Sequence, residues 1–128
     1  MSPELEAAVR SGSARAVLAL LRSGSNVDSR DRYGQTALML AAQGGDLALV
    51  EVLIAHRAHL DATAKYGLSA LMLAILAGHE RVAELLIAAG ADPSIRGTGA
   101  PGFAGETAGD LAMARGMTGL ASKLMEPR

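Results

Sequence analysis

The sequence repeats itself with a period of 33 residues, and this feature restricts the possible folds more than any other. The stretch GQTALMLAAQGG, which begins at Gly34, returns as GLSALMLAILAG at Gly67. Over the full period, residues 31–63 share 13 identities with residues 64–96. A tandem repeat of this length predicts stacked units of supersecondary structure, each of which buries its apolar residues against the neighbouring copy.

Two further copies flank this central pair. Residues 2–30 follow the same pattern without its leading turn, and residues 97–126 follow it after a five-residue insertion. We therefore expect residues 1–128 to form one domain of four repeats (2–30, 31–63, 64–96 and 97–126), with the first and last acting as caps. Polar residues, including the C-terminal residues 126–128, are expected to cover the ends of the stack.

Each copy reads as two short helices separated by a glycine. Residues that can accept hydrogen bonds from the first helical turn stand where helices are expected to begin: Ser2, Ser13, Thr36, Asp46, Ser69 and Thr107. Glycines, which adopt left-handed dihedrals without penalty, stand where the first helix of each copy must end: Gly12, Gly45, Gly78 and Gly116. The polar segments RDRYGQ and AKYGLS, each ahead of a first helix, predict tight hairpins.

Composition supports an all-α fold and excludes several kinds of partner. Half of the residues are apolar, mostly Ala and Leu, and three aromatic residues cannot fill a broad core. The net charge of −1, with scattered Lys and Arg, argues against nucleic acid as a partner. No apolar run is long enough to span a membrane, the first residues do not resemble a secretory signal, and cysteine is absent, so we expect a cytoplasmic protein without membrane contact.

The pattern Asp-x-x-Gly-x-Thr-Ala-Leu-x-Leu-Ala-Ala-x-x-Gly, followed by Val-x-x-Leu-Ile and by Gly-Ala-Asp-Pro, resembles the ankyrin repeat. The resemblance covers almost the whole chain and implies a solenoid of helix pairs with projecting hairpins. The Pro and His that are common in the family's Thr-Pro-Leu-His signature are replaced by Ala37 and Met39, then by Ala70 and Met72. Arg57 occupies a glycine position, where we expect a left-handed residue to be strained by roughly 1–2 kcal/mol.

The resemblance implies a non-catalytic function, in which a partner protein binds the concave face made by hairpin tips and first helices. Carried over by position, the binding residues are Arg32, Tyr33, Gln35 and Gln43 in the second repeat, Lys65, Tyr66, Leu68 and Leu76 in the third, Phe103 in the insertion, and Arg115 in the fourth. We expect a monomer that serves as a scaffold. The alternative function is a small inhibitor that occludes the active cleft of a partner enzyme, as some family members do.

Leu68 and Leu76 are the most informative of these positions. They replace Gln35 and Gln43 of the preceding repeat, so two residues expected to meet solvent become apolar together. With Tyr66 beside them, they match the composition of binding hot spots. The alternative is that both leucines pack against the insertion at residues 97–106, in which case the apolar patch is an internal contact.

Other motifs indicate a metal or cofactor site only weakly. His56, His59 and Asp61 have a spacing that could hold a metal ion, but a further fixed ligand is missing, and a solvated turn is the simpler interpretation. Residues 97–102 spell the dinucleotide fingerprint G-x-G-x-x-G without the strand, helix and acidic residue that it requires. His79 is interpreted as a local hydrogen-bonding residue. We therefore predict no metal, no cofactor and no enzymatic activity.

Overall fold

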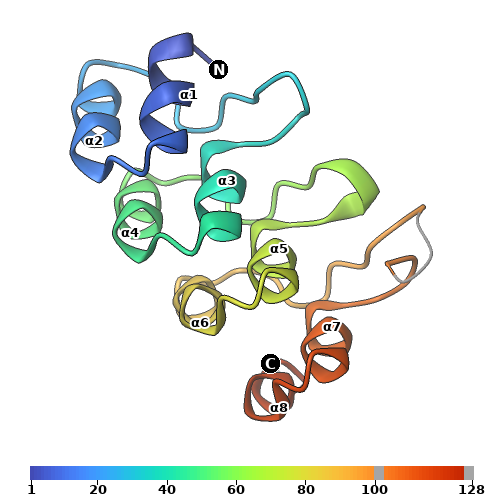
Figure 1. The fold of residues 1–128 in the computed structure, drawn as a ribbon. Helices are drawn as coiled ribbons and strands as arrows, with labels where there is room; N and C mark the ends of the chain where they lie inside the picture. The colour runs from blue at the N-terminus through green and yellow to red at the C-terminus, as the bar shows by residue number, and fades with distance from the viewer. Residues whose placement is uncertain (100–102, 126–128) are drawn as a thin grey trace.

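The computed structural model describes residues 1–99 and 103–125 of the chain, which form four antiparallel helix pairs (Figure 1). The pairs are α1 (Pro3–Arg10) with α2 (Ala14–Arg22), α3 (Ala37–Gly44) with α4 (Leu47–Ala55), α5 (Ala70–Leu76) with α6 (Glu80–Ala88), and α7 (Ala108–Ala114) with α8 (Thr118–Leu124). A single 3-10 turn, η1 (Lys65–Gly67), precedes α5. The predicted all-α fold of paired short helices is confirmed. The predicted polar end at residues 126–128 lies outside the described residues.

The predicted capping residues begin six of the helices. Each side chain accepts a hydrogen bond from a backbone N–H in the first turn of its helix: Ser2, Ser13, Thr36, Asp46, Ser69 and Thr107. At α7 the bond is reciprocal, because the N–H of Thr107 donates to the Asp110 carboxylate at 3.0 Å. This backbone bond is the main reason that the pKa of Asp110 is lowered from its usual value.

The helices form two layers. Helices α1, α3, α5 and α7 stack on one another as the inner layer, and α2, α4, α6 and α8 form the outer layer (Figure 1). The small residues Ala42 of α3 and Ala74 of α5 are fully buried, and the larger Leu38 and Leu53 are also buried. Burial of these residues between successive pairs, where water is excluded, is the main stabilising contribution to the stack.

Hydrogen bonds recur between successive repeats with the period of the sequence. The Asp28 carboxylate accepts the backbone N–H of His59 at 2.8 Å, and the Asp61 carboxylate accepts that of Asp92 at the same distance. Both bonds join one inter-repeat loop to the next. Among the helices described, none has both the length and the apolar character needed to cross a membrane.

The turn glycines do more than reverse the chain. Gly45 has a φ of 71°, and a Cβ atom built there would lie 2.6 Å from Nδ1 of His79 in the next repeat. Gly78, at the equivalent position one repeat later, has a φ of 85° and no atom within 4 Å of such a Cβ. Gly45 therefore satisfies two requirements, a left-handed backbone and close contact with the neighbouring unit, whereas Gly78 satisfies the first alone.

We predict that Gly45→Ala lowers the free energy of unfolding by about 1–3 kcal/mol more than Gly78→Ala does. Both variants carry the strain of a left-handed alanine, and only Gly45→Ala forces the His79 ring away from the turn. Urea denaturation of the two variants beside the wild type measures the difference. Equal losses of unfolding free energy in the two variants would show that the His79 ring moves aside without destabilising the protein.

Arg57 has a φ of 60°, so the prediction of a left-handed arginine at this turn is confirmed. Its side chain is exposed. The conformation is therefore not explained by burial of the side chain.

Arg57→Gly is expected to raise the free energy of unfolding by about 0.5–1 kcal/mol, because glycine removes the steric strain but loses more chain entropy on folding. Arg57→Ala is the control, since alanine removes the guanidinium and keeps the strain. Thermal denaturation of both variants separates the effects. A similar gain in both would attribute the change to the arginine side chain and not to the backbone.

Candidate protein-binding face

The two loops between the first three helix pairs and the described part of the third connection project from the same edge of the stack (Figure 1). Single antiparallel bridges close the first two loops, between Arg30 and Thr36 and between Thr63 and Ser69. The predicted projecting hairpins are thus tight loops with one bridge each, and the described residues contain no longer strand. We call the surface made by these loops and by the exposed sides of the inner helices the loop face.

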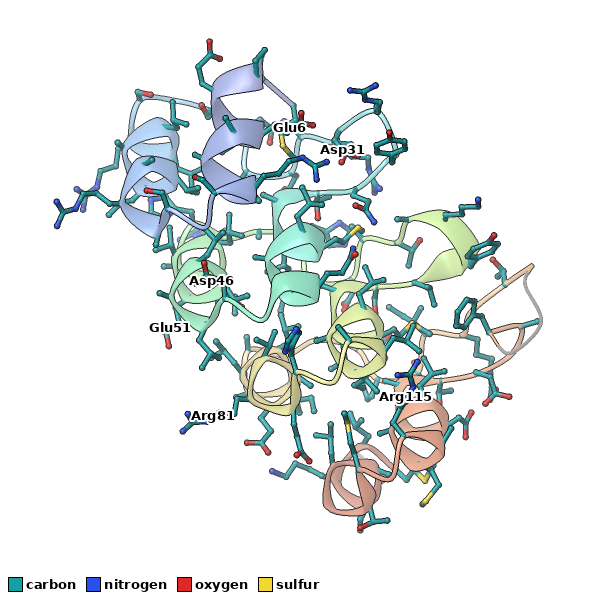
Figure 2. All side chains as sticks on the ribbon, in the orientation of Figure 1. Glu6, Asp31, Asp46, Glu51, Arg81 and Arg115 are labelled. Carbon is teal, nitrogen blue, oxygen red and sulfur yellow. The ribbon has the colours of Figure 1, made fainter. Side chains whose placement is uncertain are left out.

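Asp31 organises the first loop. Its side chain has no exposed surface, and its Oδ1 accepts the backbone N–H groups of Tyr33 and Gln35, each at 2.9 Å. Its Oδ2 accepts a bond from the Arg10 guanidinium at 3.2 Å, and Glu6 lies 3.9 Å from the same guanidinium. Glu6 and Asp31 lie close together above α3 (Figure 2). One buried carboxylate therefore fixes the turn that carries Tyr33 and joins it to α1.

Each of the first two loop tips pairs a tyrosine with a cation. The Arg32 guanidinium lies 5.6 Å from the centre of the Tyr33 ring, and the Lys65 ammonium lies 5.0 Å from that of Tyr66. Tyr33 is 67 % exposed and Tyr66 is 37 % exposed. Both distances are short enough for a cation–π attraction, so each tip presents an aromatic ring held beside a positive charge.

Tyr66 also has an unusual backbone conformation. Its φ is 64°, and Arg57 is the other non-glycine residue with a positive φ in the described parts of the chain. A left-handed conformation costs a residue with a Cβ atom about 1–2 kcal/mol. The aromatic side chain is therefore presented at this tip against the local preference of the backbone.

The insertion before α7 packs on the loop of Tyr66. The Phe103 ring centre lies 5.7 Å from that of Tyr66, and the N–H of Thr98 donates to the Tyr66 carbonyl at 2.6 Å. Arg96, just before the insertion, donates to the carbonyl of Gly105 at 2.6 Å. Phe103 is half-buried in this contact. The described part of the insertion thus extends the row of loops and supports Tyr66.

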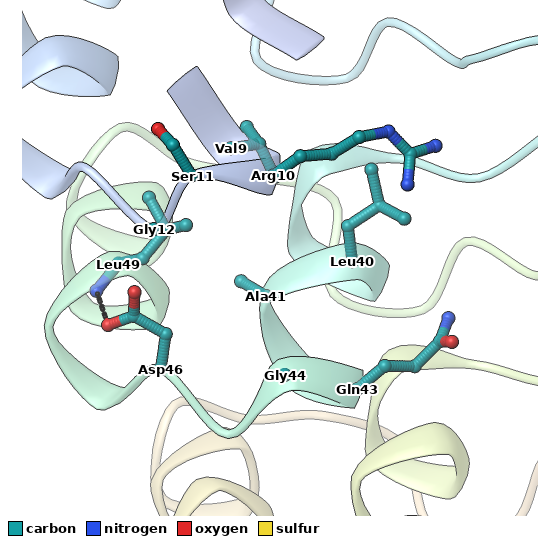
Figure 3. Close-up of a pocket in the computed structure, with 10 residues that line it drawn as sticks. All are labelled: Val9, Arg10, Ser11, Gly12, Leu40, Ala41, Gln43, Gly44, Asp46 and Leu49. Carbon is teal, nitrogen blue, oxygen red and sulfur yellow. Dashed lines mark hydrogen bonds between the residues drawn. The ribbon is translucent and has the colours of Figure 1, made fainter. Parts of the chain in front are cut away.

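A pocket opens between the C-terminal ends of α1 and α3 (Figure 3). Its volume is about 470 Å³. Arg10 and Gln43 border it on the loop side, and Asp46 and Gly12 border it on the side of the turns between helices (Figure 3). Gln43 lies in α3, and the exposed Arg115 directly follows the last residue of α7, so both lie at the C-terminal end of an inner helix.

A family model for ankyrin repeats, in three copies, matches residues 5–96 of the chain. The chain belongs to the ankyrin repeat family. Ankyrin repeats generally serve as modules for binding other proteins, and the family is typically non-catalytic. No curated protein matches the sequence. The pair α7 and α8 lies beyond the matched residues and packs on α5 as a further unit of the same shape.

The expectation that Leu68 meets solvent is wrong. Leu68 is 6 % exposed and belongs to the core, and Leu76 is half-buried against that core. Gly67, next to Leu68, approaches Thr98 of the insertion so closely that a Cβ on this glycine would lie 3.1 Å from the Thr98 hydroxyl oxygen. The insertion thus lies against the loop that carries Leu68. The alternative, an internal contact, describes Leu68 better than a solvent-exposed anchor does.

The remaining candidate residues are divided between exposed and partly buried positions. Arg32, Tyr33, Lys65 and Tyr66 are exposed at the loop tips, whereas Gln35 and Gln43 are half-buried. The pairing of each tyrosine with the cation before it was not predicted from the sequence. The signal was present, because the dipeptides Arg32-Tyr33 and Lys65-Tyr66 stand one period apart.

The histidines form no metal cluster with other His, Asp or Glu residues in the part of the chain that the structure describes. Nδ1 of His56 lies 3.0 Å from the Val52 carbonyl, and His59 is exposed. His79 begins α6 without a capping bond from its side chain, so its predicted hydrogen-bonding role is not observed there. Residues 100–102 of the G-x-G-x-x-G match lie outside the described residues, and no helix begins at residues 97–99.

We predict that Asp31→Ala lowers the free energy of unfolding by about 1–3 kcal/mol, because it leaves two backbone N–H groups and the Arg10 guanidinium without their acceptor. Asp31→Asn retains an oxygen that can accept the turn bonds and should lose less. Denaturation gives the stabilities, and amide hydrogen exchange at Tyr33 and Gln35 reports the turn itself. Unchanged exchange in Asp31→Ala would contradict the organising role of Asp31.

Proposed function

We propose that this ankyrin repeat protein binds a partner protein on the loop face and catalyses no reaction. The observation that carries the proposal is Tyr66, an exposed aromatic residue held at a positive φ between Lys65 and Phe103. Backbone strain of this kind persists where the surrounding structure enforces it, and it is concentrated at functional sites. A tyrosine offers a large contact area with few rotatable bonds, which is why tyrosines are enriched at binding hot spots.

The partner surface should be acidic around an apolar centre. Arg32 and Lys65 at the loop tips and Arg115 directly after α7 are exposed cations on the loop face. Glu51 and Arg81, in contrast, project from the outer helices (Figure 2). Complementary charges at the rim of an interface mainly accelerate association and select the partner, whereas the buried aromatic contacts slow dissociation. Tyr33 and Tyr66 therefore supply most of the affinity in this proposal.

Leu68 and Leu76 contribute less to the proposed binding surface than their positions in the repeat suggested. Leu68 supports the loop from inside the core, and Leu76 adds a half-buried apolar edge to the floor of the loop face. The proposed contact residues are therefore Arg32, Tyr33, Gln35, Gln43, Lys65, Tyr66, Leu76, Phe103 and Arg115.

The test is affinity capture from the native cell with the wild type and with the double variant Tyr33→Ala, Tyr66→Ala. A partner that binds the wild type should bind the double variant at least about thirtyfold more weakly when its Kd is measured with purified proteins. Glu51→Ala and Arg81→Ala, on the outer helices, are the controls and should leave the Kd unchanged. Higher salt should weaken the wild-type complex chiefly by slowing its association.

A partner whose affinity is unaffected by loss of both tyrosines, or is lost in the outer-helix controls, would contradict this proposal. An enzyme among the captured proteins distinguishes the two forms of the function. If its turnover falls on binding, the chain acts as an inhibitor that occludes a cleft. If its turnover is unchanged, the chain acts as a scaffold.

A further inference from the structure

The pocket between α1 and α3 contains a carboxylate oxygen that the fold does not use. Asp46 begins α4, and its Oδ1 accepts the backbone N–H of Leu49 at 3.1 Å (Figure 3). Its Oδ2 has no hydrogen bond or ion pair in the described parts of the chain, and it is not among the unpaired polar atoms there that are buried. A Cβ built on Gly12, which also lines the pocket, would lie 3.2 Å from this oxygen. The pocket therefore offers a negative charge that an incoming group can reach.

The start of α4 does not require this charge. At the equivalent position one repeat earlier, the Ser13 hydroxyl caps α2 by accepting the N–H of Ala16 at 3.1 Å. One repeat later the position is His79, whose side chain makes no capping bond. Serine and asparagine stabilise the start of a helix about as well as aspartate does. Capping accounts for a polar side chain at Asp46, but not for its negative charge.

The charges around the pocket favour a cation. Arg10 is the one positively charged residue among the described residues that line it, and its guanidinium lies 3.2 Å from Asp31 and 3.9 Å from Glu6. Two carboxylates already surround that guanidinium, and Asp46 adds a third negative charge with no cation beside it. This excess attracts an ammonium or guanidinium group and repels a carboxylate.

The side-chain donors that line the pocket are used or buried. The Ser11 hydroxyl donates to the carbonyl of Ala8 at 3.1 Å, and the Arg10 guanidinium donates to Asp31. Nε2 of Gln43 has no hydrogen-bond partner, but it is buried, so an occupant of the pocket cannot reach it. The polar group that remains available is an ionised acceptor, and a positively charged donor makes the strongest hydrogen bond with such a group.

The walls of the pocket select a cation with a hydrocarbon stem. Val9, Leu40 and Leu49 contribute apolar surface to a volume of about 470 Å³. Lysine and arginine pack their methylene groups along such surface while the charged end stays at a polar group. A metal ion needs several ligands, and the described residues contain no cluster of His, Asp or Glu that could supply them.

We propose that this pocket binds a lysine or arginine side chain of the partner protein, whose charged end donates to Oδ2 of Asp46. The inference rests on the proposed function, because Gln43 belongs both to the pocket and to the proposed contact residues, so a partner on the loop face reaches the pocket. It goes further by naming a basic residue that the partner contributes. The partner then places acidic groups at the loop tips and a basic group at the pocket, and this charge pattern sets its orientation on the stack.

The test is a titration of the purified protein with Nα-acetyl-lysine methylamide, followed by NMR through the backbone amide signals. We expect the signals of Gly12 and Leu49 to shift and to saturate with a Kd on the order of 1–10 mM. The arginine derivative should act in the same way. The norleucine derivative, which has a similar stem without the charge, should shift these signals much less. Sodium chloride at the same ionic strength is the control for screening.

Asp46→Asn separates the charge from the cap. Because asparagine caps a helix about as well as aspartate does, this variant should melt close to the wild-type temperature, yet bind the lysine derivative about three- to tenfold more weakly. Glu51→Gln is the matched control, since it removes the same charge from the same helix outside the pocket, and it should leave the Kd unchanged. The captured partner protein should show the same pattern in the two variants.

Signals of Gly12 and Leu49 that do not respond to the lysine derivative, or that respond equally in Asp46→Asn, would overturn this inference. A captured partner whose Kd is the same in Asp46→Asn would also overturn it, and the proposed function would survive if that partner still requires Tyr33 and Tyr66. A partner that depends on Asp46 and on neither tyrosine would contradict the proposed function and support the pocket. A partner that depends on none of the three residues would overturn both proposals.

Discussion

Burial of small and aliphatic residues between successive helix pairs is the interaction on which this structure depends. The helices have 7–9 residues each, too few to be stable alone in water. Ala42, Ala74 and Leu53 have no exposed surface, and all three belong to a core cluster that includes residues of every helix pair. Capping side chains satisfy the helix ends, but they add about 1 kcal/mol each and cannot replace this burial. The period of the sequence is therefore a consequence of how one unit stabilises another.

The same contacts determine how precisely the loop face is built. Because Asp28 and Asp61 each accept a backbone N–H from the following repeat, the loops are held to one another as well as to their own helices. Asp31 adds a bond from α1 to the first loop tip. Tyr33 and Tyr66 are consequently presented at a fixed separation by the scaffold, and a preorganised surface loses less entropy when it binds.

Local rules allowed much of the fold to be predicted from the sequence. The caps, the turn glycines and the left-handed Arg57 were all predicted, because each depends on the backbone within a few residues. Leu68 was predicted wrongly for the opposite reason. Comparison of repeats assigns the same surroundings to Gln35 and Leu68, but the third repeat is followed by the insertion, whose Thr98 and Phe103 pack on the Leu68 loop. The unsatisfied amide of Gln43 was not predictable, since it depends on which acceptors the folded neighbours provide.

Tyr66, Arg57 and Gln43 depart from the rules that stabilise the rest of this sequence. Tyr66 and Arg57 have a positive φ, and Gln43 carries a buried donor without an acceptor. All three belong to the two central repeats, which are packed between neighbours on both sides and so have the largest reserve of burial energy. A strained or unsatisfied group in a terminal repeat would open that repeat more readily, because the unit there is held by one neighbour. The central repeats are thus where a recognition residue that lowers stability can be carried without unfolding the stack.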